Sequence, residues 1–250
     1  MKIRLLPLLL LLAALPSLPA AEPADYLRDF ARDAAVRWPK NRTLAIVAHG
    51  HSVPAGYMRA GLVRTVDAYP RLLHVALGDR YPYAVINVIV TAIGGEHAEK
   101  GAARFARDVL PLQPDVLLID YSLNDRSIGL DCAELAWRSM IEQALAAHIK
   151  VILLTPTLDT KADLADPSDQ LNQHAALVRR LAAEYDVALV DSLAACGAAV
   201  NSGRDPARLM SQNNHPNRAG HELVARQLLD WFPAPPPPPS SVPVAPSASK

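Results

Sequence analysis

The chain has 250 residues, with 25 Lys and Arg against 25 Asp and Glu. This balance, without a run of basic residues, excludes nucleic acid as a main partner, because phosphate binding needs clustered Lys and Arg. Two cysteines, Cys132 and Cys196, are too few for a structural zinc site of their own. They could form one disulfide or remain two buried thiols, and the sequence leaves both alternatives open.

The two ends of the chain lie outside the predicted domain. Residues 1–20 begin with Lys2 and Arg4, continue as a short apolar run and end in small residues, which is the pattern of a secretory signal peptide. Residues 233–250 are rich in proline and predict a disordered tail. We therefore expect one domain over 21–232, exported to the periplasm or secreted, with no transmembrane segment after signal cleavage.

Five short apolar runs alternate with helical patterns along this domain. The runs predict buried strands, because they are rich in Val, Ile and Leu and lack polar alternation. In chain order, the expected strands are Leu44–Ala48, Ala84–Val90, Val116–Asp120, Val151–Thr155 and Val187–Val190. The expected helices are 58–79, 97–109, 133–148, 170–185 and 219–231. This alternation predicts an α/β fold built on a doubly wound, five-stranded parallel sheet.

Polar residues follow several of these strands, at the edge where functional sites of such sheets form. Ser52 follows the first strand, Gly95 the second and Asn124 the third. His215 lies in a late loop that can return to the same edge. A serine hydroxyl needs a base to act as a nucleophile, and an imidazole suits that role. Gly95 and Asn124 can offer N–H donors to the oxyanion of an acyl transfer.

Four segments of the chain resemble the sequence blocks of the SGNH, or GDSL-like, hydrolases. In chain order they are Gly50-His51-Ser52, 87–95, 121–125 and 214–221. The first block usually reads Gly-Asp-Ser and the third Gly-x-Asn-Asp, so His51 and Ser122 depart from the pattern. The resemblance covers roughly residues 43–232. It implies a flavodoxin-like, three-layer α/β/α sandwich and ester hydrolysis through an acyl-serine intermediate.

The resemblance also implies roles for individual residues. Ser52 would be the nucleophile and His215 the general base. The backbone N–H groups of Ser52 and Gly95 and the side chain of Asn124 would hold the oxyanion. No metal or organic cofactor is implied. The substrate would be a small-molecule or carbohydrate ester, with O-acetyl groups on carbohydrate as one candidate; lipid esters and acyl transfer to another alcohol stay open, and no oligomeric state is predicted.

One departure concerns the partner of the histidine. The family usually has an Asp three residues before the catalytic His, and here that position holds Gln212. A carboxylate normally orients the imidazole and stabilises its charged form. Three outcomes stay open: a Ser–His dyad aided by Gln212 or a backbone carbonyl, another acid swung into place, or an inactive chain. The candidate acids are Asp125, Asp159 and Asp205.

Two other classes of function compete with the serine esterase. His49 and His51 alternate along a strand and so share one face, and with His97 or His215 they could hold zinc in a metal-dependent hydrolase. The second alternative is an inactive hydrolase fold that binds carbohydrate or serves as a scaffold. Gln212 and Ser122 motivate that alternative, because both depart from the blocks of the active family.

Overall fold

A computed structural model describes residues 23–235, so the predicted signal peptide and most of the predicted tail lie outside the described residues. Its main feature is a five-stranded sheet with the strand order β2-β1-β3-β4-β5 and parallel pairing throughout. The strands are β1 (Thr43–Gly50), β2 (Val85–Val90), β3 (Val116–Asp120), β4 (Lys150–Leu154) and β5 (Ala188–Val190). This is the flavodoxin-like order, in which the winding reverses between β1 and β3.

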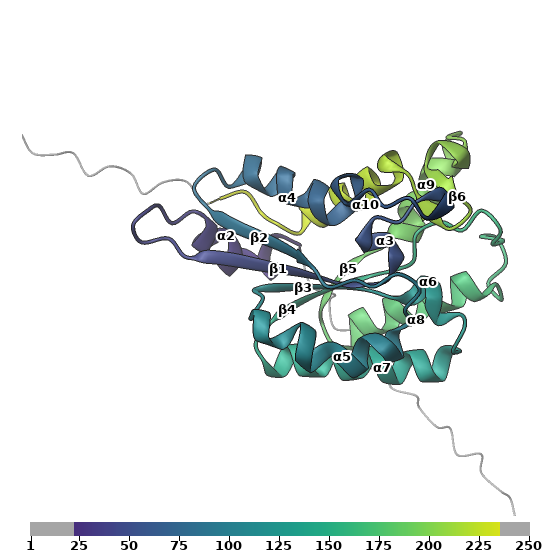
Figure 1. Ribbon diagram of the computed structural model, residues 1–250, viewed down its shortest axis with the longest axis horizontal. Helices are drawn as coiled ribbons and strands as arrows, with labels where there is room; N and C mark the ends of the chain where they lie inside the picture. The colour runs from purple at the N-terminus through teal and green to yellow at the C-terminus, as the bar shows by residue number, and fades with distance from the viewer. Residues whose placement is uncertain (1–22, 236–250) are drawn as a thin grey trace, which may run out of the picture.

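Helices cover both faces of the sheet, which makes the predicted three-layer sandwich (Figure 1). The helices are α1 (Pro23–Tyr26), α2 (Arg28–Ala34), α3 (Ser52–Ala55), α4 (Tyr69–Arg80), α5 (Ala98–Asp108), α6 (Ser122–Asp125), α7 (Leu130–Ala146), α8 (Gln170–Glu184), α9 (Ser192–Asn201) and α10 (Arg218–Asp230). In Figure 1, α5, α7 and α8 lie below the sheet, and α4, α9 and α10 lie above it. The predicted α/β class and parallel sheet are confirmed.

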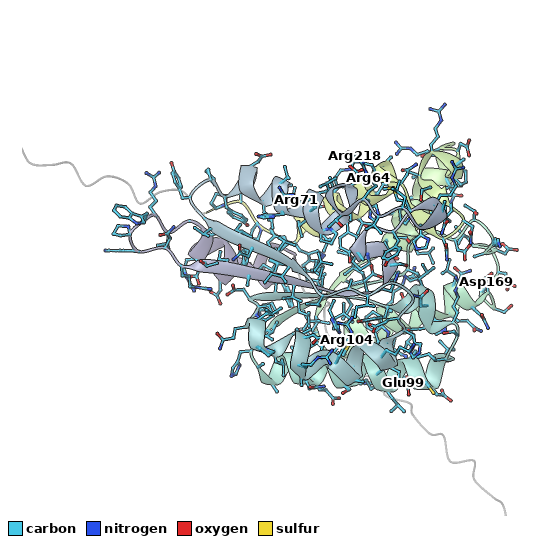
Figure 2. The ribbon with its side chains drawn as sticks, viewed as in Figure 1. Arg64, Arg71, Glu99, Arg104, Asp169 and Arg218 are labelled. Carbon is cyan, nitrogen blue, oxygen red and sulfur yellow. The ribbon has the colours of Figure 1, made fainter. Side chains whose placement is uncertain are left out.

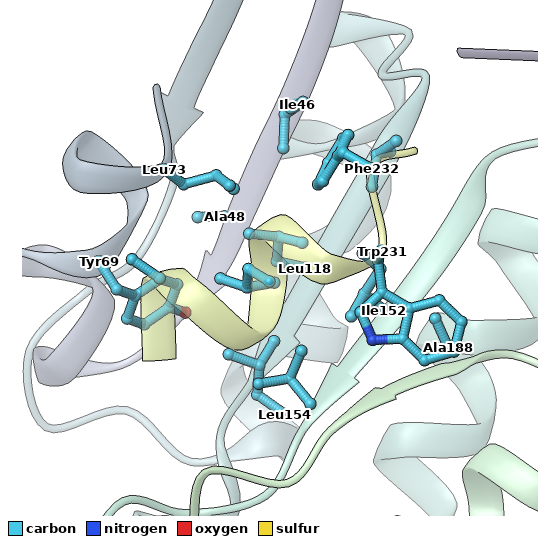
Figure 3. Close-up of a cluster of buried hydrophobic side chains, with 14 of the residues drawn as sticks. Ile46, Ala48, Tyr69, Leu73, Leu118, Ile152, Leu154, Ala188, Trp231 and Phe232 are labelled. Carbon is cyan, nitrogen blue, oxygen red and sulfur yellow. The ribbon is translucent and has the colours of Figure 1, made fainter. Parts of the chain in front are cut away.

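The core forms on both faces because successive strand residues point in opposite directions. In β1, Ile46 and Ala48 join the cluster under α4 and α10, whereas Val47 joins the cluster over α5 and α7. Figure 3 shows the first cluster, with Tyr69 of α4 and Phe232 after α10 placed over the strand side chains. Fully burying one aliphatic side chain contributes about 1.5–3 kcal/mol to the free energy of unfolding. The helices on each face bury one of the two clusters, so both helical layers stabilise the sheet.

The predicted helix over 58–79 is wrong in its first half. Residues 58–68 form two 3₁₀ turns, and the regular helix α4 begins only at Tyr69. Gly61 has a φ of +75°, which ends any right-handed helix at that point. Leu62 and Val66, whose spacing suggested a buried helical face, are 56% and 60% exposed.

Ion pairs to the last helix help to fix this irregular segment. Asp67 accepts from Arg64 at 2.9 Å and from Arg218 of α10 at 2.7 Å. Figure 2 shows the two arginines side by side in the upper layer. Arg218 and Arg64 together hold the pKa of the Asp67 carboxyl below its usual value, because both favour its charged form.

Several elements were not expected from the sequence, among them α1, α2, α9 and a short antiparallel hairpin of β6 (Met210–Gln212) and β7 (His215–Pro216). The two cysteines are free: Cys132 is exposed in α7 below the sheet, and Cys196 is buried in α9 above it. The structure therefore favours two thiols over the disulfide. Among residues 23–235, no helix is both long and apolar enough to cross a membrane.

Candidate active site

The local fold places Ser52 at the carboxyl edge of the sheet, in the turn between β1 and α3. Gly50 ends the strand where a Cβ would lie only 2.4 Å from the backbone oxygen of Asp120, so only glycine fits that approach. Ser52 is the first residue of α3, and its backbone N–H therefore has no partner within the helix. Its side chain is largely buried, with 7% of the residue exposed.

The β6–β7 hairpin brings His215 to the same edge from the other end of the chain. The start of α10 fixes it: the Asn217 side chain accepts from the Gly220 backbone N–H at 3.2 Å and so caps that helix. Gly220 in turn lies so close to Leu209 that a Cβ would meet the Leu209 carbonyl oxygen at 2.3 Å. As a result, His215 Nε2 lies 2.8 Å from Ser52 Oγ, although 163 residues separate them in sequence.

The environment of His215 favours its neutral form. Burial lowers the pKa of the imidazole below its ordinary value, and a positive charge on nearby His51 would lower it further. A neutral imidazole can accept a proton on one ring nitrogen, which is what a general base requires. The pair of Ser52 and His215 is therefore arranged for proton transfer between Oγ and Nε2.

Gln212 occupies the position behind this imidazole. The hairpin register sets Gln212 directly opposite His215, and its side-chain amide contacts His215 Nδ1. The amide NH₂ also donates to Asn214 Oδ1 at 3.3 Å. With NH₂ toward Nδ1, the histidine proton sits on Nε2; with the amide oxygen turned to Nδ1, the proton sits on Nδ1 and Nε2 can take the serine proton. Gln212 can thus select the tautomer of His215, but it brings no charge.

Asp125 is held elsewhere and does not reach His215. Its carboxylate accepts from the Ala98 backbone N–H and from Trp137 Nε1, both at 2.7 Å. Burial raises the pKa of this carboxyl, and the two donors counteract that effect only in part. Asp125 therefore ties α6 to α5 and α7 rather than supporting the base.

The other two candidate acids also have their own partners. Asp159 binds Arg126 at 2.9 Å, and Asp205 accepts from the Ala207 backbone N–H at 2.9 Å. Neither makes a contact with His215. Of the alternatives that the sequence left open, the structure places the side chain of Gln212 against the imidazole.

A glycine turn follows β2 at the same edge of the sheet, where the Ile93 backbone N–H donates to the Gly50 carbonyl at 3.0 Å. Gly95 has a φ of +80°, which favours glycine, and no acceptor among residues 23–235 binds its backbone N–H. Gly94 packs under Tyr57, whose ring would lie 2.9 Å from an added Cβ. Asn124 of α6 donates one amide hydrogen to the Glu96 carbonyl at 2.8 Å, which fixes α6 against the turn and leaves its second amide hydrogen free.

His49 and His51 do not form the pair that a metal site would need. His49 Nδ1 lies 2.8 Å from Thr91 Oγ1 and its Nε2 lies 3.2 Å from the Gly101 carbonyl, so both ring nitrogens already have hydrogen-bond partners within the fold. Burial lowers the pKa of His49 to about 4. His51 Nδ1 accepts from the Val53 backbone N–H at 3.2 Å. Within the described part of the chain, no group of three or more His, Cys, Asp or Glu could hold a metal ion.

Sequence analysis missed the surroundings of His51. Its Nε2 lies 3.3 Å from Asp120 Oδ1 at the end of β3, and Tyr69 OH donates to Asp120 Oδ2 at 3.1 Å. The sequence feature that could have pointed to this contact is Asp120 itself, an acid at the last position of an otherwise apolar strand. Without the register, which pairs Gly50 with Asp120, nothing connected that acid to His51.

Comparisons with known proteins place this chain in a family. A family model of the GDSL-like Lipase/Acylhydrolase family matches residues 48–223. An acetylxylan esterase from Geobacillus stearothermophilus is 28% identical over 162 residues, which are 60% of this chain and 73% of the relative. The chain is thus a serine hydrolase that acts on ester bonds, and it belongs to the GDSL-like lipase/acylhydrolase family. The non-enzymatic alternative is set aside on this finding.

Solved structures agree with the fold. The crystal structure of an acetylxylan esterase from Geobacillus stearothermophilus matches with a TM-score of 0.66 and 25% identity, over 76% of this chain and 94% of that chain. A catalytic mutant of that esterase, with an aspartate replaced by alanine, matches with a TM-score of 0.65 and 24% identity, over 79% and 96% of the two chains. In that enzyme the aspartate stands three residues before a histidine that another catalytic mutant replaces.

Proposed function

We propose that this protein is a carbohydrate esterase that removes O-acetyl groups, with Ser52 as the nucleophile and His215 as the general base. The observation that carries the proposal is the 2.8 Å contact between Ser52 Oγ and His215 Nε2 at the carboxyl edge of the sheet. The acetylxylan esterases among its relatives support the substrate class. Acetyl is also the smallest common acyl group, which suits a serine that is largely buried.

The reaction proceeds in two halves. Ser52 Oγ attacks the carbonyl carbon of the ester while His215 Nε2 takes its proton. The bond between the carbonyl carbon and the sugar oxygen then breaks, and His215 returns the proton to the leaving alcohol. A water molecule repeats the sequence on the acetyl-serine, giving up its proton to His215 and releasing acetate and the free serine.

Three N–H donors would stabilise the oxyanion in both halves. They are the backbone N–H groups of Ser52 and Gly95 and the free amide hydrogen of Asn124. Each belongs to a turn at the end of a different strand. The contact of Gly50 with Asp120 fixes the Ser52 turn, and the hydrogen bond from Asn124 to the Glu96 carbonyl fixes the other two turns against each other. Donors that are already in place cost no reorganisation when the charge forms, which is why such holes accelerate acyl transfer.

Gln212 takes the position that an acid holds in relatives. With its amide oxygen toward Nδ1, it accepts the Nδ1 proton and keeps Nε2 ready for Ser52. It orients the imidazole, but it cannot neutralise the positive charge that His215 gains in the transition state. We therefore expect an active enzyme whose kcat is lower than a carboxylate at this position would permit.

The test compares wild type with Ser52→Ala on acetylated xylo-oligosaccharides, p-nitrophenyl acetate and p-nitrophenyl octanoate. We expect the wild type to release acetate, to favour the acetate ester over the octanoate, and to be labelled by a fluorophosphonate at Ser52. Ser52→Ala should lose both activities. Ser139→Ala is the matched control, because Ser139 is exposed on α7 below the sheet.

Two results would argue against the proposal. Equal turnover by wild type and Ser52→Ala would remove Ser52 as the nucleophile. Turnover of the aryl esters without acetate release from the oligosaccharide would keep the serine mechanism and reject the carbohydrate substrate. Adding a second alcohol and measuring acetyl transfer to it separates hydrolysis from acyl transfer.

Export is a further part of the proposal, and it rests on the sequence of residues 1–20 alone. The expected outcome is a mature protein that begins near residue 21 and is found outside the cytoplasm. N-terminal sequencing of the protein from cell fractions checks both points. An intact Met1 on protein that stays in the cytoplasm would reject it.

A further inference from the structure

Three buried polar side chains form a chain of contacts that begins beside Ser52, and the mechanism above uses none of them. His51, Asp120 and Tyr69 are 1%, 2% and 0% exposed. They come from the turn after β1, the end of β3 and the start of α4. Tyr69 OH donates to Asp120 Oδ2 at 3.1 Å, and Figure 3 shows the Tyr69 hydroxyl on the side of the ring away from α4.

The hydrogen bonds of His51 define its tautomer. Nδ1 accepts from the Val53 backbone N–H at 3.2 Å, and it lies 3.4 Å from Ser52 Oγ. A ring nitrogen that accepts a hydrogen bond carries no proton, so the proton of the neutral ring is on Nε2. Nε2 lies 3.3 Å from Asp120 Oδ1, close but out of line for a full hydrogen bond, and no other group among residues 23–235 binds it.

The hydroxyl of Tyr69 is the hydrogen-bond partner of a carboxylate that would otherwise be costly to bury. A buried charge without partners strongly destabilises a fold. Asp120 has the Tyr69 hydroxyl at one oxygen and the His51 ring at the other. Burial, and then the charge of Asp120, raise the pKa of Tyr69 well above its usual value. The phenol therefore keeps its proton and donates a hydrogen bond to Asp120.

We infer that His51 and Asp120, supported by Tyr69, form a linked pair of positioning residues that holds the Ser52 turn in its reactive geometry. The usual nucleophile block has an acid directly before the serine. In this chain the acid stands instead on the neighbouring strand, at Asp120, and a histidine fills the position before the serine. The inference rests on the proposed role of Ser52. The pair gives up no proton: the Ser52 proton goes to His215, and His51 keeps its own on Nε2.

The pair predicts that the two positions cannot be changed independently. His51→Asp restores the usual block residue but sets two carboxylates together in a buried site, without a cation between them. We expect its unfolding midpoint to fall by roughly 5–10 °C. Adding Asp120→Asn removes one of the two charges, so the double variant should recover at least half of that loss. Thermal unfolding of wild type, both single variants and the double variant measures the coupling.

A second set of measurements tests the effect on Ser52 itself. His51→Asn keeps an oxygen that can accept from the Val53 N–H, whereas His51→Ala has no acceptor. We expect the fluorophosphonate labelling rate to stay within about 3-fold of wild type in His51→Asn and to fall about 10-fold or more in His51→Ala. Asp120→Asn should lower kcat about 10-fold and leave KM nearly unchanged, because His51 contacts the serine and not the substrate.

His49→Asn is the matched control, because His49 is equally buried but packs below the sheet against Phe105 and Tyr121. Its effect on the unfolding midpoint should add to that of Asp120→Asn without coupling. Additive midpoints for His51→Asp and Asp120→Asn would overturn the inference, as would equal labelling rates for His51→Asn and His51→Ala. If the wild type neither hydrolyses esters nor is labelled, the proposed function fails, while the unfolding midpoints still decide whether residues 51 and 120 are linked.

Discussion

The two sides of Ser52 differ in burial and in charge. On the sheet side, His51 and Asp120 are almost fully buried at the ends of adjacent parallel strands, and the side includes a carboxylate. On the hairpin side, Gln212 and His215 are half-buried on two short antiparallel strands, and the partner of the histidine is neutral. The nucleophile is thus attached to a strand inside the buried sheet, and the base to one of the smaller elements of the fold.

Because of this difference in burial, substitutions on the two sides should have different effects on activity and stability. A two-stranded hairpin has little stability of its own and depends on its packing, here against Leu209 and the start of α10. Changes at Gln212 can therefore alter the orientation and pKa of His215 without disturbing the sheet. Changes at Asp120 act on buried strand ends, where activity and stability vary together.

The largest effect should follow from removing the base. His215→Ala leaves Ser52 without a proton acceptor at 2.8 Å, so we expect kcat/KM for p-nitrophenyl acetate to fall by about 10³-fold or more. The unfolding midpoint should change little, because the residue is half-buried and its backbone pairing remains. His148→Asn is the control, because His148 is an exposed residue with a φ of +58° in the turn that follows α7. A loss of less than about 10-fold would mean that another group serves as the base.

The next largest effect belongs to the sheet side. Asn124→Ala removes one donor from the oxyanion and the contact with the Glu96 carbonyl, so we expect kcat to fall by about 10²-fold. Steady-state kinetics on p-nitrophenyl acetate measures it, with KM expected to change little. Asn172→Ala, which loses contacts only to Asp163 and Asp166 in a distant loop, should leave kcat unchanged. An unchanged kcat in Asn124→Ala would remove this side chain from the oxyanion site.

Much of the fold could be predicted because burial leaves its pattern in the sequence. The strands are largely runs of aliphatic residues, and β3 is buried along its whole length. The expected β3, Val116–Asp120, matches the observed strand at both ends. Periodicity failed at 58–68, where Leu62 and Val66 have helical spacing. In that segment, the positive φ of Gly61 and the ion pairs of Asp67 determine the conformation of the backbone. Neither feature can be detected from the spacing of hydrophobic residues.

The candidate site, too, could be predicted only in part from the sequence. Ser52 and His215 could be named in advance because their blocks carry recognisable residues at fixed spacing. The relation of Gln212 to His215 needed the hairpin register, and the pairing of His51 with Asp120 needed the register of β1 and β3. Contacts between strands that lie far apart in sequence leave no local pattern, so only the folded chain reveals them.

A smaller effect in the opposite direction tests the neutral partner on the hairpin side. Gln212→Glu has nearly the same shape and places a carboxylate at His215 Nδ1, where it can stabilise the imidazolium that forms in the transition state. We expect kcat to rise by about 10-fold. Gln212→Leu, which has neither charge nor hydrogen bond, should lower kcat instead. If both variants are equally slow, the amide of Gln212 is essential in itself and is not a weaker substitute for an acid.

The smallest effect is a displacement of the pH profile. Catalysis needs neutral His215, and burial lowers the pKa of this group below 6.5, so wild-type kcat/KM should hold as the pH falls and drop only below pH 6.5. In Gln212→Glu the added carboxylate favours the charged imidazole, which raises its pKa and moves the acidic limb upward by about 1–2 pH units. The variant would thus be faster than wild type near pH 8 and lose that advantage toward pH 5. Profiles of kcat/KM with p-nitrophenyl acetate between pH 4.5 and 8.5 check this, and coinciding acidic limbs would show that residue 212 does not act on the protonation of His215.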